Sequence, residues 1–259
     1  MATVLMGIDK SIGETRDKKK YRHKGLPATS LKTLMGDVQY KRAVYETTLE
    51  NGEKACIYLL DEALNLSTYG KVTTNLATRI ADVVSVSSFR EAAKNVSSMT
   101  GQTISHGGVW NVIQDMGQKL AEVDQINSEL AVRNEGKGQK KTEILFEEAD
   151  GVWINMQGKD RPKKGRKCEM KMAVAYDGWE LQGKGRYSLR NKVMAAGFEE
   201  AKEFQKKKEG AIAAVFNTDE INIRILNADG GGWIKRGTVD DVHFQLDPFH
   251  RLSFLIRCR

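Results

Sequence analysis

The sequence predicts a mixed α+β protein, and three observations lead to this fold class. Asn51-Gly52 separates two runs in which apolar and polar residues alternate, which is the strongest short signal for a β-hairpin. Residues 73–123 then carry apolar side chains at the spacing of amphipathic helices. Beyond residues 134–141, which are polar, basic and glycine-containing, the apolar period becomes that of strands. We therefore expect a helical region followed by an α/β region.

Local signals place the elements of the first region. The predicted hairpin covers residues 45–59. Ser88-Phe-Arg-Glu91 is a capping box that begins a helix, Gly101 ends this helix, and the next helix begins near Ser105. Residues 1–37 show no strong periodicity and are expected to form a basic, irregular segment.

The second region is predicted to alternate strands with helices. A hairpin and helical region over residues 38–135 would thus precede an α/β domain over residues 142–259. The expected strands cover residues 144–150, 152–157, 170–176, 221–227 and 242–246, with a further candidate at 187–195, a helix at 198–208 and a short helix after Asp229.

The charge distribution favours a polyanionic partner. The net charge of +7 results from 41 Lys and Arg residues against 34 Asp and Glu residues. Residues 10–24 and 159–171 each hold seven basic and two acidic residues, and residues 133–141 hold four and one. Nucleic acid is the polyanion that such clusters predict. The alternative is that these side chains only solvate loops.

Composition also bears on the cellular compartment. No apolar run approaches the roughly 20 residues that a membrane-spanning helix needs, and the N-terminus does not read as a signal peptide. Cys56, Cys168 and Cys258 are isolated, without zinc-ligand spacing or the even count of a disulfide framework. We expect a cytoplasmic protein without a membrane partner.

The helices over residues 88–100 and 105–120 match a helix-turn-helix unit, because a short glycine-containing turn joins them. The second helix would then enter the major groove of DNA. Asn and Gln side chains can form paired hydrogen bonds with adenine. An ordinary helical hairpin in a bundle is the alternative reading. The candidate DNA-binding residues, which lie off the apolar face of the second helix, are His106, Trp110, Asn111 and Gln114.

Carboxylates at strand ends form a second candidate site. Glu147, Glu148 and Asp150 end the first predicted strand of the α/β domain, Asp229 follows a later strand, and Asp247 follows the last one. Acids that converge at neighbouring strand ends bind Mg²⁺ or Mn²⁺ through hard oxygen ligands. The alternative is that these acids are solvated turn residues. His250 is a candidate metal ligand or support for one, or a structural residue.

Two sets of motifs carry a resemblance to known proteins. Phe89-Arg-Glu-Ala-Ala and Thr100-Gly-Gln-Thr-Ile-Ser105 resemble the helix-turn-helix of bacterial insertion-sequence transposases. The second set consists of Leu145-Phe-Glu-Glu-Ala-Asp-Gly-Val-Trp153, Gln157-Gly-Lys-Asp160, Glu169-Met-Lys171, Arg224-Ile-Leu-Asn-Ala-Asp-Gly230, Trp233-Ile-Lys235 and Gln245-Leu-Asp-Pro-Phe-His250. On these motifs the chain is similar, over about residues 60–250, to the ISLre-two family, which is also catalogued as an uncharacterised protein family.

The resemblance implies a ribonuclease H-like catalytic domain with a triad of two aspartates and a glutamate. Asp150 matches the first acid and Asp229 the second, and they would hold Mg²⁺ or Mn²⁺. Such an enzyme cuts a DNA strand at the terminal inverted repeat of the element, and the freed 3′-hydroxyl attacks target DNA. The implied setting is the bacterial nucleoid, with a homo-oligomer assembled on DNA.

The chain differs from this family in its C-terminal residues. The third acid of the family lies on a helix beyond the fifth core strand, and residues 251–259 contain no acid. We therefore expect an incomplete catalytic domain and a truncated transposase without strand transfer. Two alternatives stay open: a non-enzymatic DNA-binding protein or transposase remnant that acts through the helix-turn-helix, and a complete metal-dependent nuclease that loses nicking in Asp150→Ala.

Overall fold

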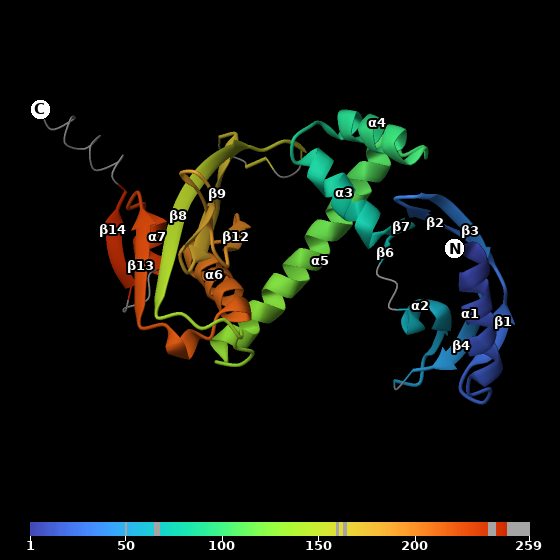
Figure 1. Ribbon diagram of the computed structural model, residues 1–259. Helices are drawn as coiled ribbons and strands as arrows, with labels where there is room; N and C mark the ends of the chain where they lie inside the picture. The colour runs from blue at the N-terminus through green and yellow to red at the C-terminus, as the bar shows by residue number, and fades with distance from the viewer. Residues whose placement is uncertain (50, 65–67, 159–160, 163–164, 238–241, 248–259) are drawn as a thin grey trace, which may run out of the picture. The chain divides into compact units, whose positions relative to one another are not determined.

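The computed structural model describes residues 1–49, 51–64, 68–158, 161–162, 165–237 and 242–247 (Figure 1). The chain divides into two compact units, residues 1–120 and 121–259. Both contain helices and sheets, so the mixed α+β class is confirmed. Within the described ranges, no helix is both long and apolar enough to cross a membrane.

The first unit contains two small sheets and the helices that pack on them. The strands pair in the orders β1-β4-β5 and β3-β2-β7-β6. Its elements are α1 (Ala2–Thr15), β1 (Arg22–Gly25), β2 (Ala28–Thr33), β3 (Gly36–Lys41), β4 (Val44–Thr48), β5 (Lys54–Ile57), α2 (Leu59–Ala63), β6 (Thr68–Tyr69), β7 (Val72–Thr73), α3 (Thr74–Val84), α4 (Phe89–Thr100) and the first part of α5 (His106–Val132).

The expectation of an irregular segment over residues 1–37 is wrong. Residues 2–15 form helix α1, which buries Leu5 against Leu31, Tyr40 and Leu60. Asp9 is buried in the same helix, and its carboxylate accepts a hydrogen bond from the backbone N–H of Ala43 at 2.8 Å. This helix has no side-chain cap and contains two glycines, so local propensity was weak and tertiary packing decided its structure.

The predicted hairpin and helices of the first unit are confirmed. Strands β4 and β5 pair as expected on either side of Asn51-Gly52, where Gly52 has a φ of 83°. Ser88 caps α4 by accepting a hydrogen bond from the N–H of Glu91, and Gly101 ends α4 in the left-handed conformation. These signals depend on neighbouring residues only, which is why the sequence predicted them.

The second unit is built on a five-stranded sheet with the order β12-β9-β8-β13-β14. Strands β8, β13 and β14 run parallel, whereas β9 is antiparallel to β8 and to β12. Its elements are β8 (Ile144–Asn155), β9 (Lys167–Tyr176), β10 (Trp179–Gly183), β11 (Arg186–Leu189), β12 (Val193–Gly197), α6 (Ala201–Val215), the 3-10 helix Thr218–Glu220, β13 (Ile223–Ala228), α7 (Gly232–Gly237) and β14 (Val242–Leu246).

Several elements of this unit differ from the predictions. Residues 144–155 form one long strand where two, 144–150 and 152–157, were expected, and the helix expected at 198–208 is α6 over residues 201–215. Strand β10 was missed, and the candidate strand at 187–195 divides into β11 and β12. A strand can continue through glycine when a neighbouring strand pairs with it, and β9 pairs with β8 along residues 146–155, with Gly151 opposite Lys171.

Helices α6 and α7 pack against one face of this sheet. Ile212 of α6 and Phe216, which directly follows α6, contact Leu145, and Ile234 of α7 contacts Leu226. Because side chains alternate along a strand, the even-numbered residues of β8 lie on the opposite face. Among the described residues of this unit, Glu148, Asp150 and Val152 are exposed there.

Candidate active site

Three aspartates occupy equivalent positions on the three parallel strands. Ala149 of β8 pairs with Ala228 of β13, and Ala228 pairs with Leu246 of β14. Asp150, Asp229 and Asp247 each follow one of these paired residues. The backbone N–H of Asp247 also donates to the carbonyl of Ala228 at 3.0 Å, which carries the pairing one step further. We call these three aspartates the acid row.

A polar row precedes the acid row on the same face. Glu148, Asn227 and Gln245 pair with one another in register, each two residues before an aspartate. The three strands therefore share a polar–apolar–Asp pattern. Asp229 and Asp247 directly follow β13 and β14, whereas Asp150 lies within β8, which continues to Asn155, so the expectation that it ends its strand is wrong. Both rows line a cavity of about 470 Å³, whose lining residues are Glu148, Ala149, Asp150, Met172, Val174, Asn227, Ala228, Asp229, Gln245 and Asp247.

Short backbone contacts orient two of the acids. The carboxylate of Asp150 accepts a hydrogen bond from the N–H of Gly151 at 2.7 Å, and that of Asp229 accepts one from the N–H of Gly231 at 2.8 Å. Both side chains are exposed, so they remain accessible to a ligand. Asn227 lies in the polar row, paired with Glu148 on one side and with Gln245 on the other. Its buried Oδ1 has no hydrogen-bond partner among the described residues.

Tyr176 fixes the side chain of Glu148 at the edge of the cavity. Its hydroxyl donates a hydrogen bond to Glu148 Oε1 at 2.8 Å. Burial raises the pKa of Tyr176 to about 12, and the hydrogen bond and charge of Glu148 act in the same direction. Tyr176 is therefore a hydrogen-bond donor at neutral pH, and Glu148 is held as its acceptor.

Glu147 does not belong to the acid row, contrary to the expectation that it joins the other strand-end acids. It points to the opposite face and is fully buried, with Lys208 Nζ at 2.5 Å and Arg224 Nε at 2.6 Å. Arg224 also binds Glu209 through two hydrogen bonds of 2.8 and 2.9 Å. Burial alone would raise the pKa of Glu147, but the two cations lower it below its ordinary value.

The buried ionic cluster of Glu147, Lys208, Glu209 and Arg224 joins three elements. Glu147 lies on β8, Arg224 on β13, and the other two on α6. Glu147 is next to Leu226 in the strand pairing, three residues before the acid row. The cluster therefore holds β8 and β13 in the register that aligns Asp150 with Asp229.

The donor chemistry of the cavity fits a hard divalent cation. Carboxylate and amide oxygens are the ligands that Mg²⁺ and Mn²⁺ prefer. Asp150 and Asp229 would hold such an ion, and the unpaired Oδ1 of Asn227 is a further oxygen beside them. Within the described ranges, no three Asp, Glu, His or Cys side chains gather closely enough to hold a metal ion together. His250 lies outside the described residues.

An uncharacterised protein family (UPF0236) has a model that matches residues 1–259. The chain belongs to this family. It is 26% identical over 229 residues to a UPF0236 protein of Streptococcus gallolyticus found in the vanSb 3′ region, a match that covers 86% of the chain and 47% of that protein. It is 23% identical over 252 residues to a UPF0236 protein of Caldanaerobacter subterraneus subsp. tengcongensis, with 96% of the chain and 47% of the relative covered.

The name of that second relative joins eleven locus designations. A further relative from the same organism is 23% identical over 252 residues, which is 96% of the chain and 44% of the relative. The chain thus spans about half the length of the curated relatives it matches.

The candidate DNA-binding residues of the UPF0236 chain lie at the start of α5. His106, Trp110, Asn111 and Gln114 are all exposed. Trp110 packs its edge on Phe89 of α4, with ring centroids 5.2 Å apart. The apolar side of this helix pair packs as the spacing predicted, with Val96 and Val109 buried and Ile113 and Met116 partly buried. Leu120 and Val123, which were expected on the same apolar face, are exposed instead.

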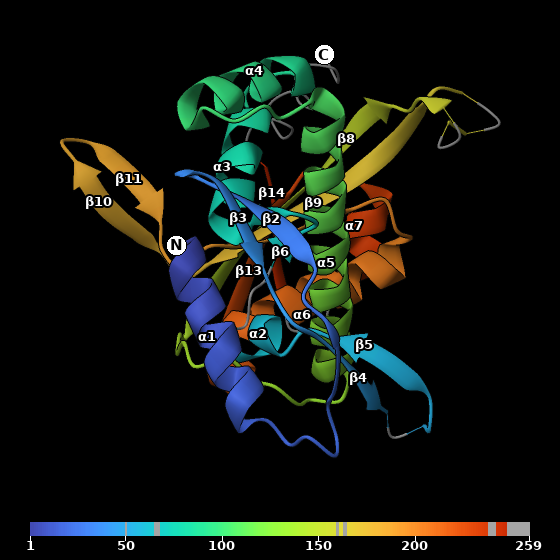
Figure 2. The same ribbon diagram turned by 90° about the vertical axis from the view of Figure 1, so that its right-hand side faces the viewer.

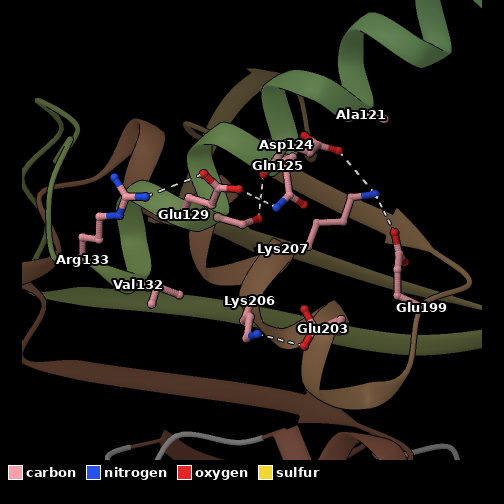
Figure 3. Close-up of a pocket in the computed structure, with 11 residues that line it drawn as sticks. Ala121, Asp124, Gln125, Glu129, Val132, Arg133, Glu199, Glu203, Lys206 and Lys207 are labelled. Atoms are coloured by element: carbon pink, nitrogen blue, oxygen red, sulfur yellow. Dashed lines mark hydrogen bonds and ion pairs between the residues drawn. The ribbon is translucent and has the colours of Figure 1, made fainter.

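A second cavity of about 440 Å³ lies between the end of α5 and α6 and contains no predicted site residue (Figure 3). Its charged side chains pair with one another. Lys207 lies 3.4 Å from Asp124 and 3.2 Å from Glu199, and Lys206 lies 2.8 Å from Glu203. The pair of Lys207 with Asp124 joins α6 to α5, and the other two pairs lie within α6 or next to its start. The acid row is therefore the better candidate for chemistry.

Asn227, Gln245 and Tyr176 are residues of this site that the sequence-based predictions do not include. A usable signal was present for the first two, because each precedes a candidate aspartate by two residues, as Glu148 does. This spacing places a polar residue and an acid on the same face of a strand. Tyr176 had no such signal, since its contact with Glu148 depends on the pairing of β8 with β9.

Proposed function

We propose that the acid row is part of the metal-binding centre of a transposase, which cuts DNA at the end of a mobile element and joins the freed 3′-hydroxyl to target DNA. The observation that carries this proposal is the alignment of Asp150 with Asp229 on neighbouring parallel strands. An antiparallel β8-β9-β12 unit, followed by β13 and β14 with a helix at each crossover, supports a ribonuclease H-like assignment. The two aspartates are then the first two acids of the triad.

The residues of the chain would prepare this centre in distinct ways. Asp150 and Asp229 would hold Mg²⁺ or Mn²⁺, and a bound ion of this kind stabilises the attacking and leaving oxygens of a phosphodiester. Asp247 adds negative charge beside Asp229. The ionic cluster around Glu147 keeps the strands aligned from the other face of the sheet.

The relatives support a mobile-element origin. A protein whose name joins eleven locus designations is encoded repeatedly in one genome, as expected of an element that copies or moves itself. The chain spans about half the length of these relatives, so only two acids of the triad, Asp150 and Asp229, are assigned to it.

Metal binding by the intact chain tests the proposal. Mn²⁺ titration followed by electron paramagnetic resonance should give binding that Asp150→Asn and Asp229→Asn each weaken at least ~10-fold, because each removes a hard anionic ligand. Glu203→Gln is the matched control, since Glu203 is an exposed acid on the far face of the same unit. Equal Mn²⁺ affinity in all four proteins would contradict the proposal.

A plasmid assay separates the transposase from a self-sufficient nuclease. Mg²⁺-dependent nicking of supercoiled DNA by this chain, lost in Asp150→Ala, would identify a nuclease complete in itself. Metal binding without nicking is the result expected if Asp150 and Asp229 hold the ion and strand cleavage needs a further acid.

A non-enzymatic DNA-binding protein is the second candidate. It is favoured by the helix pair α4–α5, in which the left-handed Gly101 ends α4 and polar residues are exposed on the first turns of α5. In this reading α5 is the recognition helix of a helix-turn-helix.

Selection of duplex DNA from a random library tests this second candidate. The double variant Asn111→Ala, Gln114→Ala should lose the selected preference, because these amides would contact base edges. Asn95→Ala, an exposed amide on α4, should retain it. If the aspartate variants bind the selected DNA normally, binding and metal chemistry are separate properties of the two units.

A further inference from the structure

The function proposed for the acid row gives no role to the hairpin formed by β10 and β11. It is inserted between β9 and β12, two neighbouring strands of the main sheet, and among the described strands it pairs only within itself. Figure 2 shows it extending beyond the strands that it connects. A two-stranded hairpin is only marginally stable by itself, so this hairpin needs stabilising contacts with the rest of the protein or with a partner.

One face of this hairpin carries large apolar and aromatic side chains. Trp179 pairs with Leu189 and Leu181 pairs with Tyr187, so these four residues share a face. The exposed fractions of Trp179, Leu181 and Tyr187 are 52%, 65% and 66%. Large apolar side chains are usually buried away from water, so a contiguous exposed group of them marks a binding surface.

The charge of the same segment indicates which kind of partner it binds. Residues 179–192 contain the basic residues Lys184, Arg186, Arg190 and Lys192, and their single acid is Glu180. Lys184 and Arg186 are exposed at the tip, beside Tyr187. Aromatic rings interleaved with cations are the combination that binds single-stranded nucleic acid, because bases stack on the rings and phosphates bind the cations.

The base of the hairpin is held rigidly. Asp177 is buried where β9 ends, and its carboxylate accepts hydrogen bonds from Arg190 Nε and Asn191 Nδ2, both at 2.9 Å. Arg190 also donates to the carbonyl of Asp177 at 2.9 Å. The hairpin therefore has a fixed direction relative to β9, which favours a docking element over an untethered loop.

A continuous series of contacts leads from the hairpin to the acid row. The Trp179 ring lies 4.9 Å from that of Phe146 and 5.5 Å from that of Tyr176, between centroids. Tyr176 binds Glu148, which lines the same cavity as Asp150. Phe146, Glu148 and Asp150 follow one another on the same face of β8, so a strand of DNA at the acid row can continue toward the hairpin.

We propose that the β10–β11 hairpin binds unpaired DNA next to the acid row, with Trp179 and Tyr187 stacking on bases and Lys184 and Arg186 binding phosphates. The inference rests on the proposed function in one respect, that the bound strand is the one cut at the acid row. It deepens that function by naming the substrate as DNA with unpaired bases near the cleavage position.

Fluorescence anisotropy of the full chain with labelled oligonucleotides tests this proposal. The probes are a blunt duplex, the same duplex with a single-stranded tail, and the tail alone, all in EDTA so that metal-dependent cleavage cannot occur. Tyr187→Ala should weaken binding of both tailed and single-stranded probes about 10-fold while leaving the blunt duplex unchanged, because a stacking contact is lost. Tyr187→Phe keeps the ring and should bind as the parent does.

Two control variants match the changes. Trp153→Ala removes an aromatic residue of similar exposure, 60%, from the other face of β8, and should have no effect. Lys184→Ala with Arg186→Ala should reduce the slope of log affinity against log salt by about 1.4 for single strands. Lys202→Ala, an exposed lysine on α6, should leave the slope unchanged, because this lysine would contact no phosphate.

The outcomes distinguish this proposal from the proposed function. Equal tail binding by Tyr187→Ala and Trp153→Ala overturns the hairpin assignment and leaves the acid row untouched. A change of oligomeric state in Tyr187→Ala, measured by sedimentation with DNA binding intact, also overturns it, because the hairpin would then contact a second copy of the chain. Normal tail binding in Asp150→Asn supports the hairpin even if no metal binds at the acid row.

Discussion

The ammonium group of Lys208 lies 2.5 Å from the carboxylate of Glu147, and both side chains are buried. A charged helix residue thus neutralises an acid at the centre of the sheet. Arg224 binds the other carboxylate oxygen of Glu147 from the next strand. This arrangement connects a packing feature to the candidate site, because it fixes the strands that carry Asp150 and Asp229.

Removing the acid from this cluster should strongly destabilise the protein. Glu147→Ala leaves Lys208 and Arg224 buried without their counter-ion, and breaking a buried pair in this way costs about 3–5 kcal/mol. Urea unfolding followed by circular dichroism measures the loss. Glu203→Ala removes one member of an exposed pair and should change the free energy of unfolding by at most ~1 kcal/mol. Similar losses in the two variants would refute a structural role for the cluster.

The same carboxylate should make stability depend on acid pH. The pKa of Glu147 is lowered in the folded protein, because Lys208 and Arg224 outweigh the effect of burial. Its stabilising contribution is therefore complete above the ordinary glutamate pKa of about 4.3 and is lost as the pH falls toward the lowered folded value. The free-energy difference between the parent and Glu147→Gln should shrink from pH 7 to pH 3. A difference that stays constant over this range would contradict the assigned direction.

Gly210 of α6 should not tolerate a side chain. A Cβ atom at this position would lie 2.6 Å from the backbone N of Ser128 and 2.9 Å from the backbone C of Asn127, both on α5. Helix propensity favours alanine by about 1 kcal/mol, but overpacking costs about 1–3 kcal/mol, so Gly210→Ala should lower stability. Gly117→Ala meets no atom within 4 Å and should raise it. Urea midpoints that move in the same direction for both variants would disprove this reasoning.

The cap of α4 gives a prediction for the first unit. Ser88→Ala removes the side-chain oxygen that accepts the N–H of Glu91 at 3.3 Å, and loss of such a cap costs about 0.5–2 kcal/mol. Ser98→Ala, on an exposed position of the same helix, should be close to neutral. Thermal unfolding of both variants checks the prediction, and an unchanged transition in Ser88→Ala would show that tertiary contacts alone hold this helix.

Local signals explain which elements the sequence could predict. The Asn51-Gly52 hairpin, the cap at Ser88 and the end of α4 at Gly101 depend on residues a few positions apart. Strand β14 was also predicted with its observed bounds, from apolar alternation. Helix α1 was missed because its stability comes from contacts with residues more than 25 positions away, such as that of Asp9 with Ala43.

The sequence by itself determined the types of most elements and the polar–apolar–Asp pattern shared by three strands. Only the tertiary structure decided which acids lie together. Alternation sends Glu147 to the buried face and Glu148 to the open one, although they are neighbours in the chain. The pairing of β8 with β13 joins residues about 80 positions apart. Packing of α6 against the sheet and the ionic cluster beneath it set that register, and no local pattern encodes a contact between such distant residues.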